Sequence, residues 1–512
     1  MSASAPAAQP AGYSHREIMQ VLSGILLCIL LAAIDQTVVV PAVPAIARDL
    51  NGFGHLSWIV SAYLLTSTAS TPIYGRLSDM WGRRALLIPA LGLFVVASIL
   101  CALSSSIGAL IAFRALQGVG GGGLLSLAQA AIADVIAPRE RGRYQAFMAG
   151  MWGIASIAGP IVGGYVTVHL TWRWIFWFNV PLGLIAIVLS QRGLANLPVR
   201  HGGGRIDYAG AALLTGAITA FLVLMSWGGV SYPWVSPEIL ALAAAGTALA
   251  VGLVVQEHLA AEPLLPPRVF RSKVFRGGVA VAFFASLGLF AGIFLLPLYF
   301  QLARGADPAT SGLEVMPFLA ANVVGAYLAG QLARRMGRTK ALLVAGLVIS
   351  AAGFGALGLL GGAAMGLVQA VLAVLGFGIG LIMPSSLVLV QNDAERRDVG
   401  VATGSFLFLR TMGGAFGATL AGAVFIGRFG GLVAALALPV RLNLGNLDAG
   451  RASLAGLSVA QRAAVAGALG SAFSLAFLIT GFLMALAILI ALTIEDVPLR
   501  DSIHQEGEPI GH

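Results

Sequence analysis

Long apolar segments alternate with short polar ones along almost the whole chain. Fourteen of these segments are long enough to cross a hydrocarbon core about 30 Å thick as helices. So much apolar sequence cannot be buried inside one soluble core, so the pattern predicts an all-α polytopic membrane protein. The predicted spans are 18–43, 57–75, 85–104, 107–131, 144–168, 172–192, 207–229, 236–257, 277–300, 309–332, 340–361, 364–390, 399–427 and 467–493.

Basic residues between the spans predict their orientation. If the N-terminus is cytoplasmic, the cytoplasmic loops carry nineteen Lys and Arg residues and the outer loops carry seven. Because Lys and Arg concentrate in cytoplasmic loops, this asymmetry favours fourteen spans with both termini inside. The aromatic sequence WRWIFWF at 172–178 is typical of the outer membrane interface.

Composition excludes several classes of function. The chain is 58% hydrophobic and 10% charged, and its net charge of +9 is spread over short loops, which does not indicate a nucleic-acid partner. Cys28 and Cys101 both lie in apolar segments, so neither a disulfide nor a metal site is expected. The sequence has no Walker A, HExxH or GxSxG motif. We therefore expect no enzyme, no cofactor and no ATP-driven transport.

An internal repeat predicts the domain organisation. PRERGR at 138–143 precedes a span with GPIVGG, and AERRDVG at 394–400 precedes one with GGAFGATLAG, at a constant offset of 258 residues. Two parallel halves around a cavity are a transporter design. In chain order we predict a disordered cytoplasmic N-terminus, an N-terminal six-helix bundle, two inserted helices, a C-terminal six-helix bundle with a long outer loop at 428–466, and a cytoplasmic tail, at 1–17, 18–192, 207–257, 277–493 and 494–512.

Asp35 is the only acid near the middle of a predicted span. A carboxylate there costs several kcal/mol unless it is paired, hydrated or protonated. We therefore predict that Asp35 faces a water-lined cavity and couples transport to protons. The alternative is a structural carboxylate that is buried and bonded to a neighbouring hydroxyl.

A polar motif follows the second span, with the residues Gly75, Asp79, Gly82, Arg83 and Arg84. It resembles the loop between spans 2 and 3 of the major facilitator superfamily, G-x-L-x-D-x-x-G-R-[RK]. The resemblance implies two six-helix bundles that rock about a central cavity, with this loop latching one half to the other in the outward-open state. A plain basic loop is the alternative. The second copy has Arg334 at the acidic position, so no latch is expected there.

Two further motifs strengthen this resemblance. Arg114 and Gln117 in the fourth span are similar to the family's R-x-x-Q-G signature, whose Arg is implicated in proton coupling. At that depth Arg114 is expected to lie near Asp35; alternatively it snorkels to the outer interface. In the fifth span, the sequence resembles the antiporter signature G-x-x-x-G-P-x-x-G-G, which marks exporters, although such small residues also serve ordinary helix packing. Its residues are Gly159, Pro160, Gly163 and Gly164, with Ala155 at the first Gly.

The sequence around Asp35 is similar to L-D-x-T-[IV]-V-N-x-A-L-P of the fourteen-span drug:proton antiporter branch. Val40 replaces the Asn of that pattern and Pro41 is extra, which implies a changed substrate preference.

Other cavity candidates depend on weaker arguments. Arg410 could bind an anionic group or pair with a helix C-terminus, and Glu314 could line the cavity or face water at the outer end of its span. Aromatic rings could bind a lipophilic cation, although most rings in spans face lipid or pack. The aromatic candidates are Trp58, Tyr63, Trp152, Phe294, Tyr299 and Phe408.

These features predict a monomeric proton-coupled antiporter in a bacterial cytoplasmic (inner) membrane, with the lipid bilayer as its surroundings. It would export small lipophilic, cationic drugs in exchange for protons, with proton and substrate competing for Asp35. The alternative is an exporter of a dedicated physiological substrate, such as a lipid precursor, a secondary metabolite or an organic anion, bound by Arg114 and Arg410. A membrane sensor or scaffold is a third reading, for which the short tails offer no signalling domain.

Overall fold

The computed structural model describes residues 15–50, 56–196, 207–229, 232–306, 308–360, 364–436 and 458–500, and within these ranges the chain is helical. One isolated bridge, between Gly228 and Tyr232, is the only β pairing there. The helices are α1 (His15–Asp49), α2 (Leu56–Trp81), α3 (Arg83–Ala102), α4 (Ile107–Val135), α5 (Pro138–His169), α6 (Trp174–Trp177), α7 (Asn179–Gly193), α8 (Tyr208–Trp227), α9 (Pro237–Leu259), α10 (Lys273–Leu302), α11 (Pro308–Met336), α12 (Lys340–Leu359), α13 (Met365–Asp393), α14 (Val399–Ala435) and α16 (Val459–Thr493).

Polar caps determine where several helices begin. The first amides of a helix have no partner within it, and a Ser or Asp side chain can accept from them. The Ser106 side chain accepts from the amide of Ala109 at the start of α4, and Ser272 does the same for Phe275 in α10. At α16, Ser458 and its third-position Gln form a reciprocal capping box.

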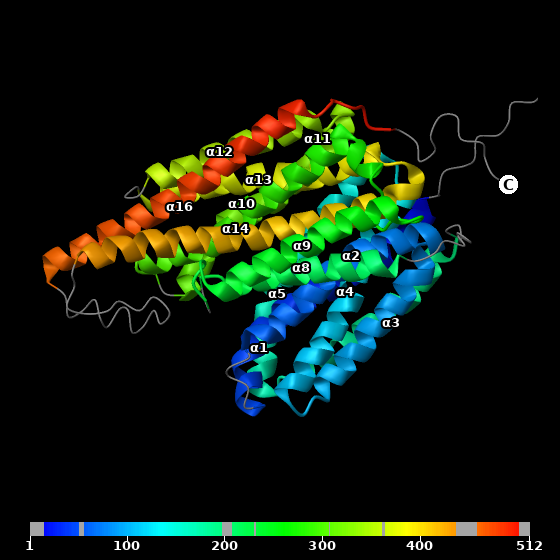
Figure 1. Ribbon diagram of the computed structural model, residues 1–512, viewed down its shortest axis with the longest axis horizontal. Coiled ribbons are helices and arrows are strands. Elements are labelled where there is room, and N and C mark those ends of the chain that lie inside the picture. The colour runs from blue at the N-terminus through cyan, green and yellow to red at the C-terminus, as the bar shows by residue number, and fades with distance from the viewer. Residues whose placement is uncertain are drawn as a thin grey trace, which may run out of the picture.

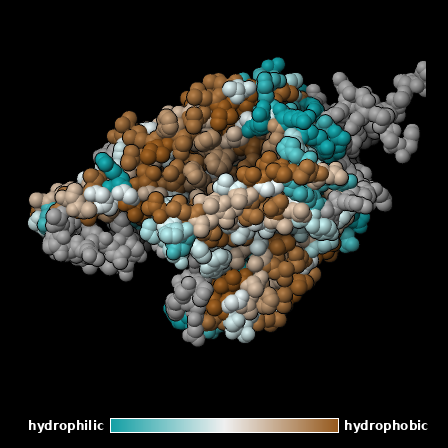
Figure 2. Space-filling model, viewed as in Figure 1, coloured by the Kyte–Doolittle hydropathy of each residue, from teal (hydrophilic) through white to brown (hydrophobic). Residues whose placement is uncertain are grey.

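Twelve segments in the described ranges, with α6 and α7 forming one of them, are long and apolar enough to cross a membrane. Helices α2 and α5 lie outside this set although they have 26 and 32 residues. The prediction of an all-α polytopic membrane protein is therefore confirmed, and the count of fourteen spans stays a prediction. In Figure 2 hydrophobic side chains cover the flanks of α12 and α16, and polar ones gather near the ends of α11 and α16.

Some boundaries differ from the prediction. Helix α14 continues to Ala435 and α16 begins at Val459, so both enter the predicted outer loop, of which 437–457 lies outside the described residues. The predicted span at 172–192 is divided into α6 and α7. Pro181 lies in the first turn of α7, where its missing N–H breaks no helical hydrogen bond.

The helices pack as two groups with a hairpin at their side. Helices α1 to α7 form the N-terminal group and α10 to α16 the C-terminal group, each with its own buried apolar cores. The groups meet through α2 against α14 and α5 against α11, while α8 and α9 pack on each other and α8 also packs on α2 and α14. Figure 1 shows the groups converging where α2 meets the start of α14 and diverging toward their opposite ends.

Candidate functional site

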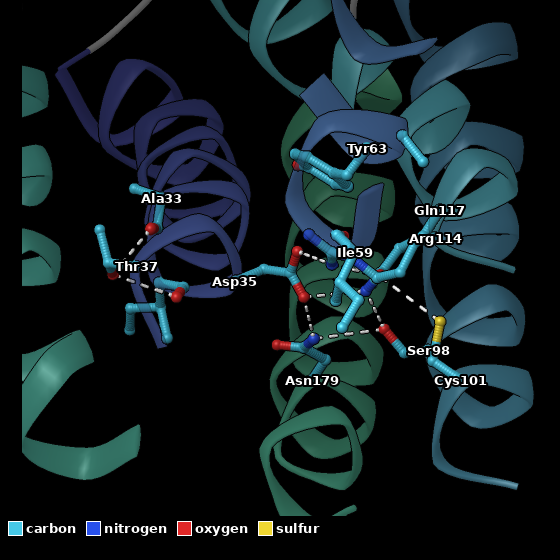
Figure 3. A network of polar contacts seen from close by, with 12 residues as sticks. Ala33, Asp35, Thr37, Ile59, Tyr63, Ser98, Cys101, Arg114, Gln117 and Asn179 are labelled. Carbon is cyan, nitrogen blue, oxygen red and sulfur yellow. Dashed lines mark hydrogen bonds and ion pairs between the residues drawn. The ribbon is translucent and has the colours of Figure 1, made fainter. Parts of the chain in front are cut away.

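Asp35 lies in the middle of α1 and is completely enclosed, with 0% of its surface exposed. Its Oδ2 atom lies 2.6 Å from Nη1 of Arg114 on α4. Its Oδ1 atom accepts hydrogen bonds from Nε2 of Gln117 at 2.9 Å and from Nδ2 of Asn179 on α7 at 2.7 Å. Figure 3 shows these side chains converging on the carboxylate from different helices. Both oxygens of Asp35 are therefore engaged.

Arg114 is as deeply buried as its partner, at 1% exposure. Its Nε atom donates to the backbone oxygen of Ile59 at 3.1 Å, and Nη1 also donates to Oε1 of Gln117 at 2.7 Å. The guanidinium lies over the Tyr63 ring, 4.4 Å from its centroid. This is a desolvated cation–π contact, which stabilises a cation held away from water. The prediction that Arg114 lies near Asp35 is met in this geometry, and Arg114 does not snorkel outward.

Two members of this cluster were not predicted from the sequence. Ser98 on α3 accepts from Gln117 Nε2 at 2.5 Å and from Asn179 Nδ2 at 3.2 Å. A single Asn or Ser in an apolar span is common, and the one available signal was the polar Asn179 directly after the aromatic sequence WRWIFWF. We call Asp35, Arg114, Gln117, Asn179 and Ser98 the Asp35 network.

The Asp35 network is sealed in this conformation. We expected Asp35 to face a water-lined cavity, but the carboxylate has no exposed surface, and its three polar partners replace water. An ionised pair can be buried in this way only because each charge is paired and hydrogen-bonded. A substrate cannot reach either oxygen of Asp35 without first separating it from its partners.

A second polar cluster joins the two helix groups. Asp79, at the end of α2, accepts hydrogen bonds from the amides of Gly400 at 2.9 Å and Val401 at 2.8 Å, the first residues of α14. These amides are the positive end of the α14 dipole, which favours an anion. Arg83 pairs with Asp79 at 2.7 Å and with Asp134 of α4 at 2.7 Å. We call these contacts the Asp79 latch.

Glycines make the Asp79 latch possible. A Cβ on Gly75 would lie 2.5 Å from the backbone oxygen of Gly400, so α2 and α14 could not approach so closely with larger residues. Gly82 has φ of 88°, in the left-handed region that favours glycine, and turns the chain from α2 into α3. Arg84 is half-buried beside the latch. Arg334 of the second copy pairs instead with Glu140 of α5, 3.6 Å away.

The glycines of the predicted antiporter motif pack α5 against α1. A Cβ on Gly159 would lie 2.0 Å from Oγ1 of Thr37, and one on Gly163 would lie 2.3 Å from the backbone oxygen of Val38. Gly164 has no neighbour within 4 Å of its Cβ position, and the Pro160 side chain lies outside the described residues. Thr37 also donates to the backbone oxygen of Ala155 at 2.8 Å.

The aromatic cavity candidates are scattered. Tyr63 belongs to the Arg114 contact above, and Tyr299 is buried in the core of the C-terminal group with Phe473 and Phe477. Phe294 is 40% exposed and lies against Gly422. The other three are partly buried: Trp58 against Trp227, Trp152 against the core of the N-terminal group, and Phe408 against the cluster between α2, α8 and α14.

The two charged cavity candidates, Glu314 and Arg410, lie on different helices of the C-terminal group. Glu314 on α11 accepts a hydrogen bond from Gln369 on α13. Arg410 is half-buried on α14. At the far end of α1, Asp49 pairs with Arg173 at 2.7 Å and accepts from the Trp172 indole. The Arg173 and Trp172 hydrogen bonds lower the pKa of the Asp49 carboxyl below its usual value.

Comparison with known proteins decides the family. The profile of the family described as Major Facilitator Superfamily matches residues 25–418. The chain belongs to the major facilitator superfamily. It is 34% identical over 413 residues to the multidrug transporter protein MdtP of Bacillus subtilis (strain 168), covering 80% of this chain and 76% of that protein. It is 35% identical over 400 residues to the efflux pump dotC of Dothistroma septosporum, covering 76% and 68%.

Solved structures agree with the fold of this superfamily. The proton:xylose symporter XylE superposes with a TM-score of 0.62 at 17% sequence identity, over 94% of this chain and 97% of that one. The chain is therefore a multi-pass transporter of the major facilitator superfamily, with efflux pumps among its relatives, and not an enzyme.

Proposed function

We propose that this transporter is a proton-coupled exporter of small lipophilic compounds that works by alternating access, as the fourteen-span drug:proton antiporter resemblance implies. In this proposal α2 and α5 complete fourteen spans, and both termini are cytoplasmic. The observation that carries it is the Asp35–Arg114 pair, enclosed at the middle of α1. Relatives named as a multidrug transporter and an efflux pump support the direction of transport.

The pair can act as a switch because protonation changes its charge. While Asp35 is ionised, the two charges cancel and both can stay away from water. A proton on Asp35 leaves Arg114 buried without a counter-ion, in contact with Ile59, Gln117 and the rings of Tyr63 and Phe176. An uncompensated buried charge is costly, so protonation favours a conformation in which Arg114 finds water or another anion.

Coupling then acts through conformation. Both oxygens of Asp35 are engaged, so we replace direct competition for this carboxylate with a model in which proton and substrate bind at different places and favour different states. In this proposal the Asp79 latch closes the basic-loop side of the molecule, as the family resemblance implies for the outward-open state. Of the two acidic cavity candidates, Asp35 is engaged by its network and Glu314 accepts a hydrogen bond from Gln369.

Transport by proteoliposomes tests this function. Under an imposed pH gradient we expect Asp35→Asn to lose pH-driven movement of a lipophilic dye, whereas Asp35→Glu keeps part of it. Asp49→Asn is the matched control, because Asp49 lies on the same helix but is half-exposed and remote from the network. Full pH-driven transport by Asp35→Asn would refute the assignment of Asp35 as the coupling residue.

A further inference from the structure

Arg410 lies at membrane depth in the middle of α14. It is ten residues beyond Gly400, whose amide joins the Asp79 latch, and ten helical residues span about 15 Å, half of a hydrocarbon core. The side chain is half-buried. Among the described residues, no hydrogen bond or ion pair engages its guanidinium.

The described helices of the C-terminal group supply no counter-ion for Arg410. Helices α10, α12, α14 and α16 contain no Asp or Glu. The acid of α13 is Asp393, at its last residue and bonded to Ser272, and the acid of α11 is Glu314, bonded to Gln369. In the N-terminal group, Asp35 is neutralised by Arg114. Within the part of the chain that the structure describes, Arg410 is therefore a positive charge without a counter-ion at this depth.

The surroundings of Arg410 are suited to an amphipathic molecule. Arg410 and Gly414 are four residues apart and share one face of α14. The Phe290 ring and the Ser286 hydroxyl of α10 lie 2.8 Å and 3.1 Å from the position of a Cβ on Gly414. Phe290 is 43% exposed. Arg410 is thus one helical turn from a contact between α14 and the partly exposed Phe290 ring of α10, whereas the Ser286 hydroxyl at this contact is buried.

We propose that Arg410 binds the anionic group of the exported substrate, so that the substrates are lipophilic carboxylates or sulfonates with an apolar body that packs against Phe290. A guanidinium offers two parallel N–H donors to such a group, and in a low-dielectric interior this contact is strong. An unpaired charge at membrane depth is costly, which favours a bound anion. The inference depends on the proposed export function and specifies its substrate class.

A pair of matched dyes tests this inference. Proteoliposomes are given a pH gradient and a coumarin dye bearing one carboxylate, or the methyl ester of the same dye. We expect wild-type protein to move the carboxylate, and Arg410→Gln to slow it about tenfold or more, as expected for loss of a charge-assisted hydrogen bond. The ester should change less than twofold. Arg410→Lys should restore part of the carboxylate transport, and Arg428→Gln, an exposed arginine on the same helix, should behave as wild type.

The outcomes separate the substrate class from the export function. If the ester or a quaternary ammonium dye moves with the pH gradient while the carboxylate does not, export stands and the anion inference is wrong. Equal slowing of all dyes by Arg410→Gln also overturns it. If replacing chloride with gluconate changes the transport of all dyes equally, chloride rather than substrate neutralises Arg410, and the inference falls. If no dye responds to the gradient, the export function itself fails.

Binding in detergent keeps the inference testable without transport. We expect the carboxylate dye to raise the Tm of the wild-type protein and to have no such effect on Arg410→Gln, while the ester has the same effect on both. An equal shift by the carboxylate dye in both proteins would contradict a contact with Arg410.

Discussion

At the residue scale, the main feature is the Asp35 carboxyl group, which is buried away from water. Arg114, Gln117 and Asn179 engage both oxygens of Asp35, and Ser98 accepts hydrogen bonds from two of these partners. Each contact replaces a hydrogen bond that water would make, so the network is stable only as a complete set. Removing a single partner therefore has a larger effect than removing the ion pair as a whole.

A double-mutant cycle tests whether the loss of one partner destabilises the protein more than the loss of the whole ion pair. Arg114→Gln leaves Asp35 buried without its counter-ion, and breaking such a pair destabilises by about 3 kcal/mol or more. Adding Asp35→Asn removes the orphaned charge, so the double variant should be more stable than Arg114→Gln alone. The measurement is the Tm of the purified proteins in detergent. Strictly additive losses would show that the two charges do not depend on each other.

The residue scale also shows what the sequence could predict. Asp35 and Arg114 were predicted as a neighbouring pair because a charge in an apolar span demands a partner. Asn179 and Ser98 were not predicted, because a neutral polar side chain in an apolar span does not require a charged partner. Their contacts depend on how α3 and α7 are placed. The burial of Asp35 also differed from the expectation of a water-lined site, since enclosure depends on which conformation the helices adopt.

At the element scale, the start of α14 is the decisive feature. Its first amides donate to Asp79, and Gly75 and Gly400 let the backbones of α2 and α14 touch. The motif predicted a cluster of charges at this loop. It did not predict that the partner would be a helix N-terminus, because backbone amides have no signature in the side-chain pattern of a sequence.

Hydrogen exchange tests the latch at the element scale. We expect Gly400→Ala to force α2 and α14 apart, since its Cβ would lie 2.4 Å from the backbone oxygen of Gly75. The amides at the start of α14 should then exchange faster, and Asp79→Asn should have the same effect because it weakens the acceptor. Gly92→Ala is the control, because no atom lies within 4 Å of that Cβ position. Unchanged exchange in both latch variants would contradict the assigned contacts.

Helix ends were the least predictable elements. Hydropathy located α14 and α16 but ended α14 several residues too early and began α16 several residues too late. Turns beyond the apolar core continue a helix without raising its hydropathy. The division between α6 and α7 was not predicted, because Pro181 lies inside an apolar segment and hydropathy shows no break there.

At the scale of the whole molecule, the internal repeat was the most informative signal. It predicted two related groups of helices, and the described helices pack as an N-terminal and a C-terminal group. The repeat could not place the α8–α9 hairpin, because these helices have no second copy. Their contacts show α8 against α2 and α14, beside the junction of the two groups.

Cysteine labelling tests the topology of the whole molecule. Glu238 begins α9 and Glu262 follows its end, so they should lie on opposite sides of the membrane if the hairpin crosses it. We expect Glu238→Cys to react with an impermeant maleimide in intact cells and Glu262→Cys to react only after permeabilisation. The background protein lacks Cys28 and Cys101, which are buried. Labelling of both positions from one side would contradict fourteen spans.

The most direct test of the central claim is to measure the proton itself. A pH-sensitive dye sealed inside proteoliposomes reports proton movement when a transported dye is added on the side from which it is taken up. We predict that wild-type protein and Asp49→Asn show a substrate-dependent pH change, and that Asp35→Asn shows none even where it still binds the dye. A pH change of wild-type size in Asp35→Asn would contradict the account, because the coupled proton would then be carried elsewhere.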